Sequence, residues 1–245
     1  MRLKLEPPAA VALDVPDLAR ARRLLDATAG MVPVYKVGLE LFAAEGPAAV
    51  REVQSRGADV FLDLKVNDIP KTVAGAVRSA AGIGARFLTV HSNAGRAAVR
   101  AAVEEAAGRL EILVVSVLTS LGDAELADLG VARSAPDQVD AMAQMAGEAG
   151  ATGLVLAAGE ASRVRAGLPE LFLVTPGIRP AALNGDDQRR TGTPAAAIAA
   201  GSDMLVLARA ACDVPDPRAA LEDILRQIHL SPSSRPKAVE TNGKR

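Results

Sequence analysis

The chain is organised around one stretch, Phe61-Leu62-Asp63-Leu64-Lys65-Val66-Asn67-Asp68-Ile69-Pro70-Lys71-Thr72-Val73. The apolar run from Val60 to Leu64 predicts a buried strand, and Ile69-Pro70 then turns the chain into a helix, because proline is tolerated in the first helical turn. Residues two apart in a strand share a face, so the opposite charges of Asp63 and Lys65 are expected side by side. Asp68 follows just past the strand end. Charges of both signs are thus crowded at one strand terminus, where burial is costly unless they are used.

Short apolar runs recur on both sides of this stretch and alternate with alanine-rich segments. Their nearly continuous hydrophobicity is typical of parallel strands that are covered on both faces. We expect strands at Ala9–Asp14, Val34–Val37, Val60–Lys65, Phe87–His91, Ile112–Leu118, Gly153–Ala157, Phe172–Thr175 and Met204–Ala208. We expect helices at Asp17–Ala29, Glu40–Ser55, Thr72–Ala81, Arg96–Gly108, Asp137–Ala149, Ala161–Ala166, Pro194–Ala200 and Pro217–His229, with an extra short helix at Ala124–Leu129. This alternation indicates an α/β fold, a (β/α)8 TIM barrel that forms a single catalytic domain over residues 1–230.

A doubly wound open sheet is the alternative architecture. No glycine-rich dinucleotide fingerprint follows the first strand, where Asp14-Val15-Pro16-Asp17 stands instead. The polar segment Pro180–Gly192 is expected to be a mobile loop. The tail, residues 231–245, is rich in Ser, Pro, Lys and Arg and is expected to be disordered.

The composition argues against several classes of protein. Aromatic residues make up only 2% of the 245 residues, and the net charge is −1, so neither base stacking nor electrostatics favours a nucleic acid or an anionic membrane. Cys212 is the only cysteine, and His91 and His229 are the only histidines, so we expect no internal disulfide and no cysteine- or histidine-based metal site. The first ten residues lack the apolar core of a signal peptide, and no run of about 18 apolar residues is present to span a membrane. A cytoplasmic protein is therefore expected.

Polar side chains gather at one end of the predicted strands. In a (β/α)8 barrel the active site lies at the carboxyl ends of the strands. Only the sixth strand contributes no ionisable residue at this end. The polar residues at the other strand ends are Asp14, Lys36, Asp63, Lys65, His91, Thr119, Ser120, Thr175 to Arg179, and Arg209. Their convergence predicts an active site on this rim of the barrel.

The central motif, Asp63-x-Lys65-x-x-Asp68-Ile69-Pro70-x-Thr72-Val73, resembles the signature of the orotidine 5′-phosphate decarboxylase family. The resemblance extends over nearly the whole chain up to His229. It includes Ala12-Leu13-Asp14, Tyr35-Lys36-Val37-Gly38, Val117-Leu118-Thr119-Ser120, Val174 to Arg179, Asp187-Gln188-Arg189-Arg190, and Val206-Leu207-Ala208-Arg209. Three positions depart from the family pattern: Ala208 stands where glycine is expected, Asn67 where many relatives have histidine, and Ala210-Ala211 where a proline and an apolar residue are usual.

The resemblance implies decarboxylation of orotidine 5′-monophosphate to UMP, the last step of pyrimidine nucleotide synthesis, without a cofactor or a metal. It implies a homodimer with shared active sites, in which Asp68 reaches into the partner's site. Lys65 would deliver the proton to C6, with Asp63 near the substrate carboxylate and Lys36 beside Asp63. The substrate-binding residues that the resemblance implies are Asp14, Lys36, Asp63, Ile69, Thr72, Thr119, Ser120, Pro176, Arg179, Gln188, Ala208 and Arg209.

Other interpretations of the same residues remain open. Asp63 and Lys65 could form an ordinary structural ion pair, Asp14 could cap the following helix, and Arg209 could form a structural ion pair. His91 is assigned no role. Two alternative functions are a metal-dependent phosphosugar decarboxylase or aldolase of the same superfamily, and a non-catalytic nucleotide-binding barrel.

Overall fold

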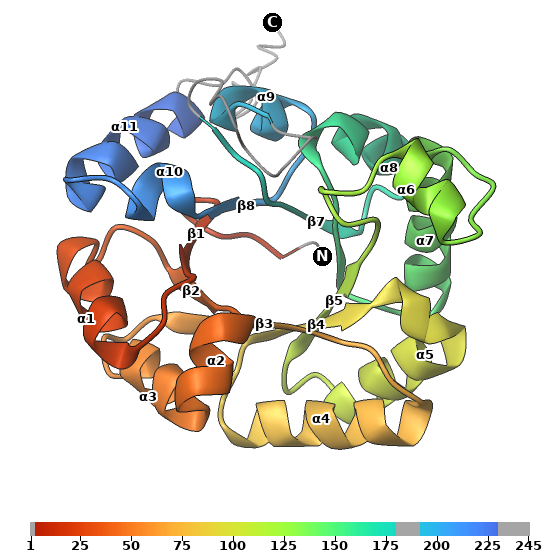
Figure 1. Ribbon diagram of the computed structural model, residues 1–245, viewed down its shortest axis with the longest axis horizontal. Coiled ribbons are helices and arrows are strands. Elements are labelled where there is room, and N and C mark those ends of the chain that lie inside the picture. Colours follow the sequence, from red (N-terminus) through yellow and green to blue (C-terminus); the bar gives the residue numbers. More distant parts are fainter. Residues whose placement is uncertain (1–2, 180–191, 230–245) are drawn as a thin grey trace, which may run out of the picture.

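The computed structural model describes residues 3–179 and 192–229, and it contains a closed barrel of parallel strands in chain order. The first strand pairs with both the second and the last, which closes the barrel. Figure 1 looks down the barrel and shows the helices as an outer ring. The strands are β1 (Ala9–Leu13), β2 (Val34–Val37), β3 (Asp59–Val66), β4 (Phe87–His91), β5 (Glu111–Val115), β6 (Gly153–Val155), β7 (Phe172–Thr175) and β8 (Met204–Leu207). The predicted (β/α)8 barrel is confirmed, and the alternative of an open sheet is wrong.

Aromatic side chains fill the inside of the barrel. Phe61, Phe87 and Phe172 are almost completely buried, and the ring centroid of Phe87 lies 6.1 Å from each of the other two. Gly153 on β6 approaches this group closely, because a Cβ atom there would lie 2.3 Å from the carbonyl oxygen of Phe172. Phe61 and Asp63 are two apart on β3, so the aromatic layer lies directly beneath the charged strand ends.

The helices cover the outside of the strands with alanine, valine and leucine side chains. Local signals set several of their starts: Asp17 caps the first helix by accepting a hydrogen bond from Arg20 N, and Pro70 occupies the first turn of the fourth. The helices are α1 (Leu18–Ala27), α2 (Leu39–Glu45), α3 (Pro47–Gln54), α4 (Pro70–Gly82), α5 (Gly95–Ala106), α6 (Asp123–Asp128), α7 (Ala135–Glu148), α8 (Ala161–Gly167), α9 (Pro194–Ala199), α10 (Arg209–Cys212) and α11 (Pro217–His229), with 3-10 turns η1 (Ser92–Ala94) and η2 (Ala158–Glu160). None of the described helices combines the length and apolar character needed to cross a membrane.

Some elements differ from the sequence prediction. The single helix expected over Glu40–Ser55 is wrong: Gly46, with φ +56°, separates α2 from α3, and Pro47 begins the second helix. The fifth strand ends at Val115 rather than at Leu118. The extra short helix is confirmed as α6, whereas α10 was not expected. The predicted tail lies outside the described residues, as does the predicted mobile loop apart from Gly192.

At the amino ends of β7 and β8, one arginine ties three segments together. Arg165 on α8 forms an ion pair with Asp203, whose carboxylate also accepts a hydrogen bond from the backbone N–H of Leu173. The same guanidinium donates to the carbonyl oxygens of Pro169, Leu171 and Gly201 at 2.7–2.8 Å. This network fixes α8 against the last two strands, far from their carboxyl ends.

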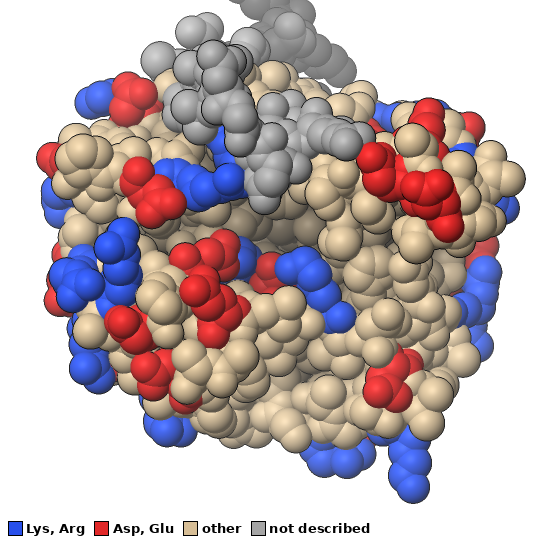
Figure 2. Space-filling model, viewed as in Figure 1, with Lys and Arg blue, Asp and Glu red and all other residues tan. Residues whose placement is uncertain are grey.

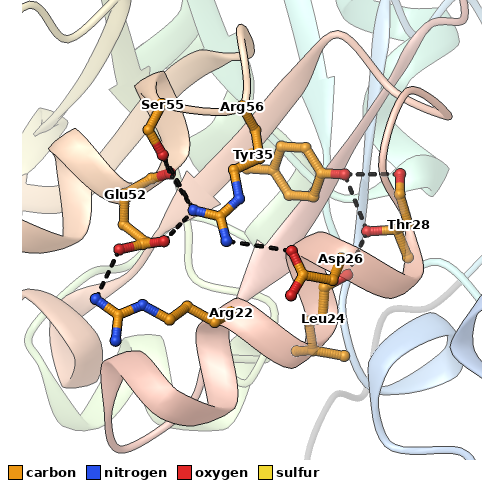
Figure 3. A network of polar contacts seen from close by, with 8 residues as sticks. All are labelled: Arg22, Leu24, Asp26, Thr28, Tyr35, Glu52, Ser55 and Arg56. Carbon is orange, nitrogen blue, oxygen red and sulfur yellow. Dashed lines mark hydrogen bonds and ion pairs between the residues drawn. The ribbon is translucent and has the colours of Figure 1, made fainter.

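On the outer side of β2, hydrogen bonds join the strand to the end of α1 (Figure 3). The Tyr35 hydroxyl donates to the carbonyl oxygen of Thr28 at 2.8 Å and shares a second hydrogen bond with Thr28 Oγ1 at 2.9 Å. Thr28 Oγ1 also donates to Leu24 O at 2.7 Å. On the surface beside them, Arg22 on α1 forms an ion pair with Glu52 on α3. Arg56, just after α3, forms ion pairs with Glu52 and with Asp26 on α1.

Candidate active site

Four side chains of alternating charge form a chain of ion pairs at the carboxyl ends of β1, β2 and β3. Lys36 Nζ lies 2.7 Å from Asp14 Oδ1 and 3.4 Å from Asp63 Oδ2. Lys65 Nζ donates to the same Asp63 Oδ2 at 2.9 Å. Lys36 and Asp63 are buried, while Asp14 and Lys65 at the two ends are partly exposed. Figure 2 shows a hollow at the centre of the molecule with acidic and basic side chains beside it. The predicted proximity of Asp63 and Lys65 is confirmed.

The buried pair in the middle of this chain is held in its charged form. Burial opposes ionisation of Asp63, but the charges of Lys36 and Lys65 and the hydrogen bonds from Lys65 and Thr89 outweigh it, so the pKa of this carboxyl is lowered from 3.8. Burial likewise opposes the charge on Lys36, but Asp63 and Asp14 outweigh it and raise the pKa of its ammonium above 10.5. At neutral pH the site therefore contains a buried carboxylate and a buried ammonium.

The backbone at Lys65 departs from the extended strand that the sequence predicts. Its φ is +48°, in the left-handed region that side chains other than glycine rarely adopt. The pairing of β3 with β4 shifts register between Leu62 and Val66, so Lys65 lies in an irregularity of the strand. Its contact with Asp63 depends on this distortion rather than on strand alternation alone. Such strain costs about 1–3 kcal/mol and persists where the surroundings enforce it.

Thr89 of β4 contacts both ends of this distorted segment. Its Oγ1 accepts a hydrogen bond from Lys65 N at 2.8 Å and donates one to Asp63 Oδ1 at 2.9 Å. The side chain is completely buried. The sequence analysis missed this residue, and the only signal was a hydroxyl within the apolar run of β4.

Gly38, at the start of α2, leaves the space that the ion pair of β1 and β2 occupies. A Cβ atom on Gly38 would lie 2.4 Å from Asp14 Oδ1 and 3.1 Å from Lys36 Nζ. Any larger residue would therefore displace the carboxylate or the ammonium. The sequence analysis included Gly38 only as part of the family resemblance.

A cavity of about 160 Å³ opens above the ion pairs. The predicted site residues that line it are Asp14, Lys36, Lys65, Thr119, Pro176, Arg179 and Ala208. The sequence analysis did not single out its apolar wall, which Val115, Val117, Leu118, Val155, Leu156 and Val206 form. The cavity thus joins a charged edge to an apolar wall.

Other predicted site residues lie outside this cavity. Asp68 and Ile69 are exposed between β3 and α4, Thr72 is exposed in the first turn of α4, and the relative exposure of Ile69 is 67%. The Asp68 carboxylate accepts a hydrogen bond from Ile69 N at 2.7 Å, and within residues 3–179 and 192–229 it forms no ion pair with Lys65. Ser120 is exposed after β5.

The remaining predicted residues lie near β7 and β8. Arg179 is buried and lines the cavity, with Nη1 donating to Ile178 O at 2.9 Å. Arg209 is exposed and begins α10, directly after Ala208, which lines the cavity. Gln188 lies outside the described residues.

Groups that could hold a metal were also considered. Among the described residues, no three or more His, Cys, Asp or Glu side chains are grouped as metal ligands would be. His91 is half-buried at the end of β4, where its Nδ1 accepts a hydrogen bond from Asn93 N at 3.2 Å. Burial, and then the charge of Lys65, lower the pKa of its imidazole below 6.5. The carboxylates of the site, Asp14 and Asp63, are instead paired with lysines.

Comparison with known proteins gives consistent matches over nearly the whole chain. Residues 7–224 match the family described as orotidine 5′-phosphate decarboxylase / HUMPS family. The chain is 48% identical over 229 residues to the orotidine 5′-phosphate decarboxylase of Thermobifida fusca, covering 93% of this chain and 98% of that protein. It is 50% identical over 214 residues to the enzyme of the same name from Anaeromyxobacter dehalogenans, covering 87% and 94%. The crystal structure of orotidine 5′-phosphate decarboxylase from Lactobacillus acidophilus is similar with a TM-score of 0.79 at 30% identity, covering 90% of this chain and 98% of that one.

Proposed function

The chain belongs to the orotidine 5′-phosphate decarboxylase / HUMPS family, and on this premise we propose that it decarboxylates orotidine 5′-monophosphate to UMP. This reaction is the last step of de novo pyrimidine nucleotide synthesis, and we place it in the cytoplasm. The observation that carries the proposal is the chain of ion pairs from Asp14 through Lys36 and Asp63 to Lys65, which borders the cavity.

The chemical difficulty lies in the electrons that CO2 leaves behind. When the bond between C6 and the carboxyl carbon breaks, its electron pair stays on C6 in the plane of the ring, where the ring cannot delocalise it. The proposal involves no cofactor, so the developing charge is stabilised by a fixed positive group. The Lys65 ammonium is partly exposed towards the cavity and held at 2.9 Å from Asp63. It then transfers one proton from Nζ to C6, which completes UMP.

The neighbouring charges hold this ammonium in place. Asp63 is ionised and buried, and its Oδ2 accepts from Lys65 while Lys36 lies on its other side. In the proposal Asp63 also lies near the substrate carboxylate, and the repulsion between the two disappears when the carboxylate departs as neutral CO2. Asp14 and Lys36 bind the ribose hydroxyls at the far end of the ion-pair chain.

The remaining parts of the substrate are assigned to the other loops. Thr119 and Ser120, which follow β5, form hydrogen bonds with the edge of the pyrimidine, and the apolar wall packs against the face of the ring. Arg179, Gln188 and Arg209 bind the phosphate, together with Pro176 and the backbone of Ala208. The loops after the seventh and eighth strands commonly bind phosphate in this type of barrel, and arginine matches the geometry of phosphate oxygens.

The proposal includes a homodimer whose two sites share residues. Asp68, Ile69 and Thr72 are exposed at the start of α4, and in the described part of the chain Asp68 forms no ion pair with its own Lys65. These observations support a role for the three residues in the partner's site, where a two-fold axis makes the exchange reciprocal.

A spectrophotometric assay with orotidine 5′-monophosphate, in buffer containing excess EDTA, tests the function. We expect full turnover, because the proposed chemistry uses an ammonium and no metal ion. Turnover that requires Mg²⁺ or Zn²⁺ would favour the alternative with a metal-bound enediolate. UMP binding without turnover would favour a nucleotide-binding barrel.

A further inference from the structure

Thr89 is a buried hydroxyl whose hydrogen bonds have a fixed direction. The backbone N–H of Lys65 can only donate, and the ionised carboxylate of Asp63 can only accept. The single hydroxyl proton of Thr89 must therefore point to Asp63 Oδ1, at 2.9 Å, while an oxygen lone pair receives Lys65 N–H, at 2.8 Å. One hydroxyl thus connects the backbone of Lys65 to the carboxylate that its own ammonium contacts.

This arrangement divides the two oxygens of Asp63 between different partners. Oδ1 accepts from Thr89, whereas Oδ2 faces the ammonium groups of Lys65 at 2.9 Å and Lys36 at 3.4 Å. Without the hydroxyl, Oδ1 would lose this partner in a buried environment. The carboxylate would then be free to rotate, and the position of Lys65 Nζ would change with it.

The second bond supports the left-handed backbone at Lys65. Where a strand is irregular, its N–H groups lose their regular partners in the neighbouring strand and need another acceptor. Thr89 supplies that acceptor from β4, next to the register shift between Leu62 and Val66. Thr89 does not line the cavity within the described residues, so any effect on a ligand passes through Lys65 and Asp63.

We propose that Thr89 is a positioning residue that holds the Lys65 ammonium against the reacting carbon by joining the Lys65 backbone to the Asp63 carboxylate. The inference rests on the proposed function, since it assigns Thr89 to the same site.

The test compares Thr89→Val, Thr89→Ala and Thr89→Ser with wild type and with Thr28→Val. The control removes an equally buried hydroxyl with two side-chain hydrogen bonds, on the outer side of β2 (Figure 3). For the valine and alanine variants we expect kcat to fall about 100-fold, the scale of a small misplacement of a reacting group, with little change in the Kd of UMP. Thr89→Ser and Thr28→Val should keep kcat per folded molecule near that of wild type.

Three results would overturn the proposal: normal kcat in Thr89→Val, equal loss in Thr89→Ser and Thr89→Val, or failure of both hydroxyl-free variants to fold, which would make the hydroxyl a requirement of the barrel itself. Hydrogen exchange at the Lys65 amide provides a readout independent of the reaction. It should be at least about tenfold faster in Thr89→Val than in Thr28→Val, and unchanged exchange would overturn the bridge even if wild type proved inactive. If wild type showed no turnover but the Lys65 amide still exchanged faster in Thr89→Val, the proposed reaction would be refuted. The structural link that Thr89 makes between Lys65 and Asp63 would be retained.

Discussion

Asp63 is the residue of the site whose carboxylate contacts the largest number of charged groups. It is 8% exposed, yet it contacts two ammonium groups and one hydroxyl. A buried carboxylate without such partners would take up a proton, since desolvation penalises the charged form. Here the partners prevail, and the charge is retained together with that of Lys36.

The lowered pKa of Asp63 predicts a pH-dependent contribution to stability. A carboxyl with a pKa lowered by folding stabilises the protein fully above its unfolded pKa, near 3.8, and the contribution is lost as the pH falls towards the folded value. At pH 7 we expect Asp63→Asn to be about 3 kcal/mol less stable than wild type, because an ion partner is removed from a buried pair. Urea unfolding between pH 7 and pH 3 should show this difference constant at first and shrinking below about pH 4.

The control is Asp128→Asn, the same substitution at an exposed aspartate, which should show no such dependence of stability on pH. A stability difference between wild type and Asp63→Asn that stayed constant or widened down to pH 3 would show that Asp63 is not held ionised by its lysines.

For single residues, the sequence predicts the charged side chains of the site but not the neighbouring residues that hold them in place. Charges are rare in apolar runs, so Asp63 and Lys65 stand out. Thr89 does not, because threonine is common in strands and its hydrogen bonds depend on a register shift between β3 and β4 that has no local signature. The closeness of Gly38 to Asp14 likewise appears only once two strands are adjacent.

The elements of the barrel are tied together at the end opposite the site. Arg165 on α8 connects three carbonyl groups and the carboxylate of Asp203. These contacts are mostly shielded from solvent, and they fix the amino ends of β7 and β8. Their role is structural, so we expect that removing them lowers the stability of the protein without changing its catalytic rate.

Arg165→Met should lower the free energy of unfolding by about 3–5 kcal/mol, because it removes the cation from an ion pair that is mostly shielded from solvent. Urea denaturation measures this loss, and kcat per folded molecule should be unchanged. The matched control is Arg163→Met on the same helix, whose ion pairs with Asp137 and Asp140 are exposed and should contribute little. Equal urea midpoints for the two variants would contradict the assigned role of Arg165.

Helices and strands are predicted correctly where the hydrophobic pattern is strong, and the errors lie at the residues where they begin and end. The break between α2 and α3 follows from the positive φ of Gly46 and from Pro47, which an alanine-rich pattern conceals. The early end of β5 reflects Ser116, whose hydroxyl donates to Val155 O at 2.7 Å where the apolar run continues in sequence.

Over the whole molecule, alternation of apolar runs and alanine-rich segments was sufficient to predict the closed barrel, because parallel strands covered on both faces have few other solutions. The assembly was a different matter. The sequence carries no direct signal of a partner subunit, and the homodimer that we propose is supported by the exposure of Asp68, Ile69 and Thr72.

A mixing experiment tests the shared site. Lys65→Ala and Asp68→Ala proteins should each be inactive, and subunit exchange should make about half of the dimers mixed. Each mixed dimer has one site with both defects and one with neither, so about a quarter of all sites should regain wild-type activity. If Asp68 serves its own subunit, no activity returns after verified exchange, and the shared site is rejected.

The most direct test of the account is the turnover of Lys65→Ala at saturating orotidine 5′-monophosphate, measured beside the Kd of UMP. If Lys65 stabilises the charge on C6 and supplies its proton, kcat should fall by at least about 10⁴-fold while UMP still binds. Lys71→Ala, which removes an exposed lysine of the same motif, should retain turnover. Near-normal turnover by folded Lys65→Ala protein would contradict the account.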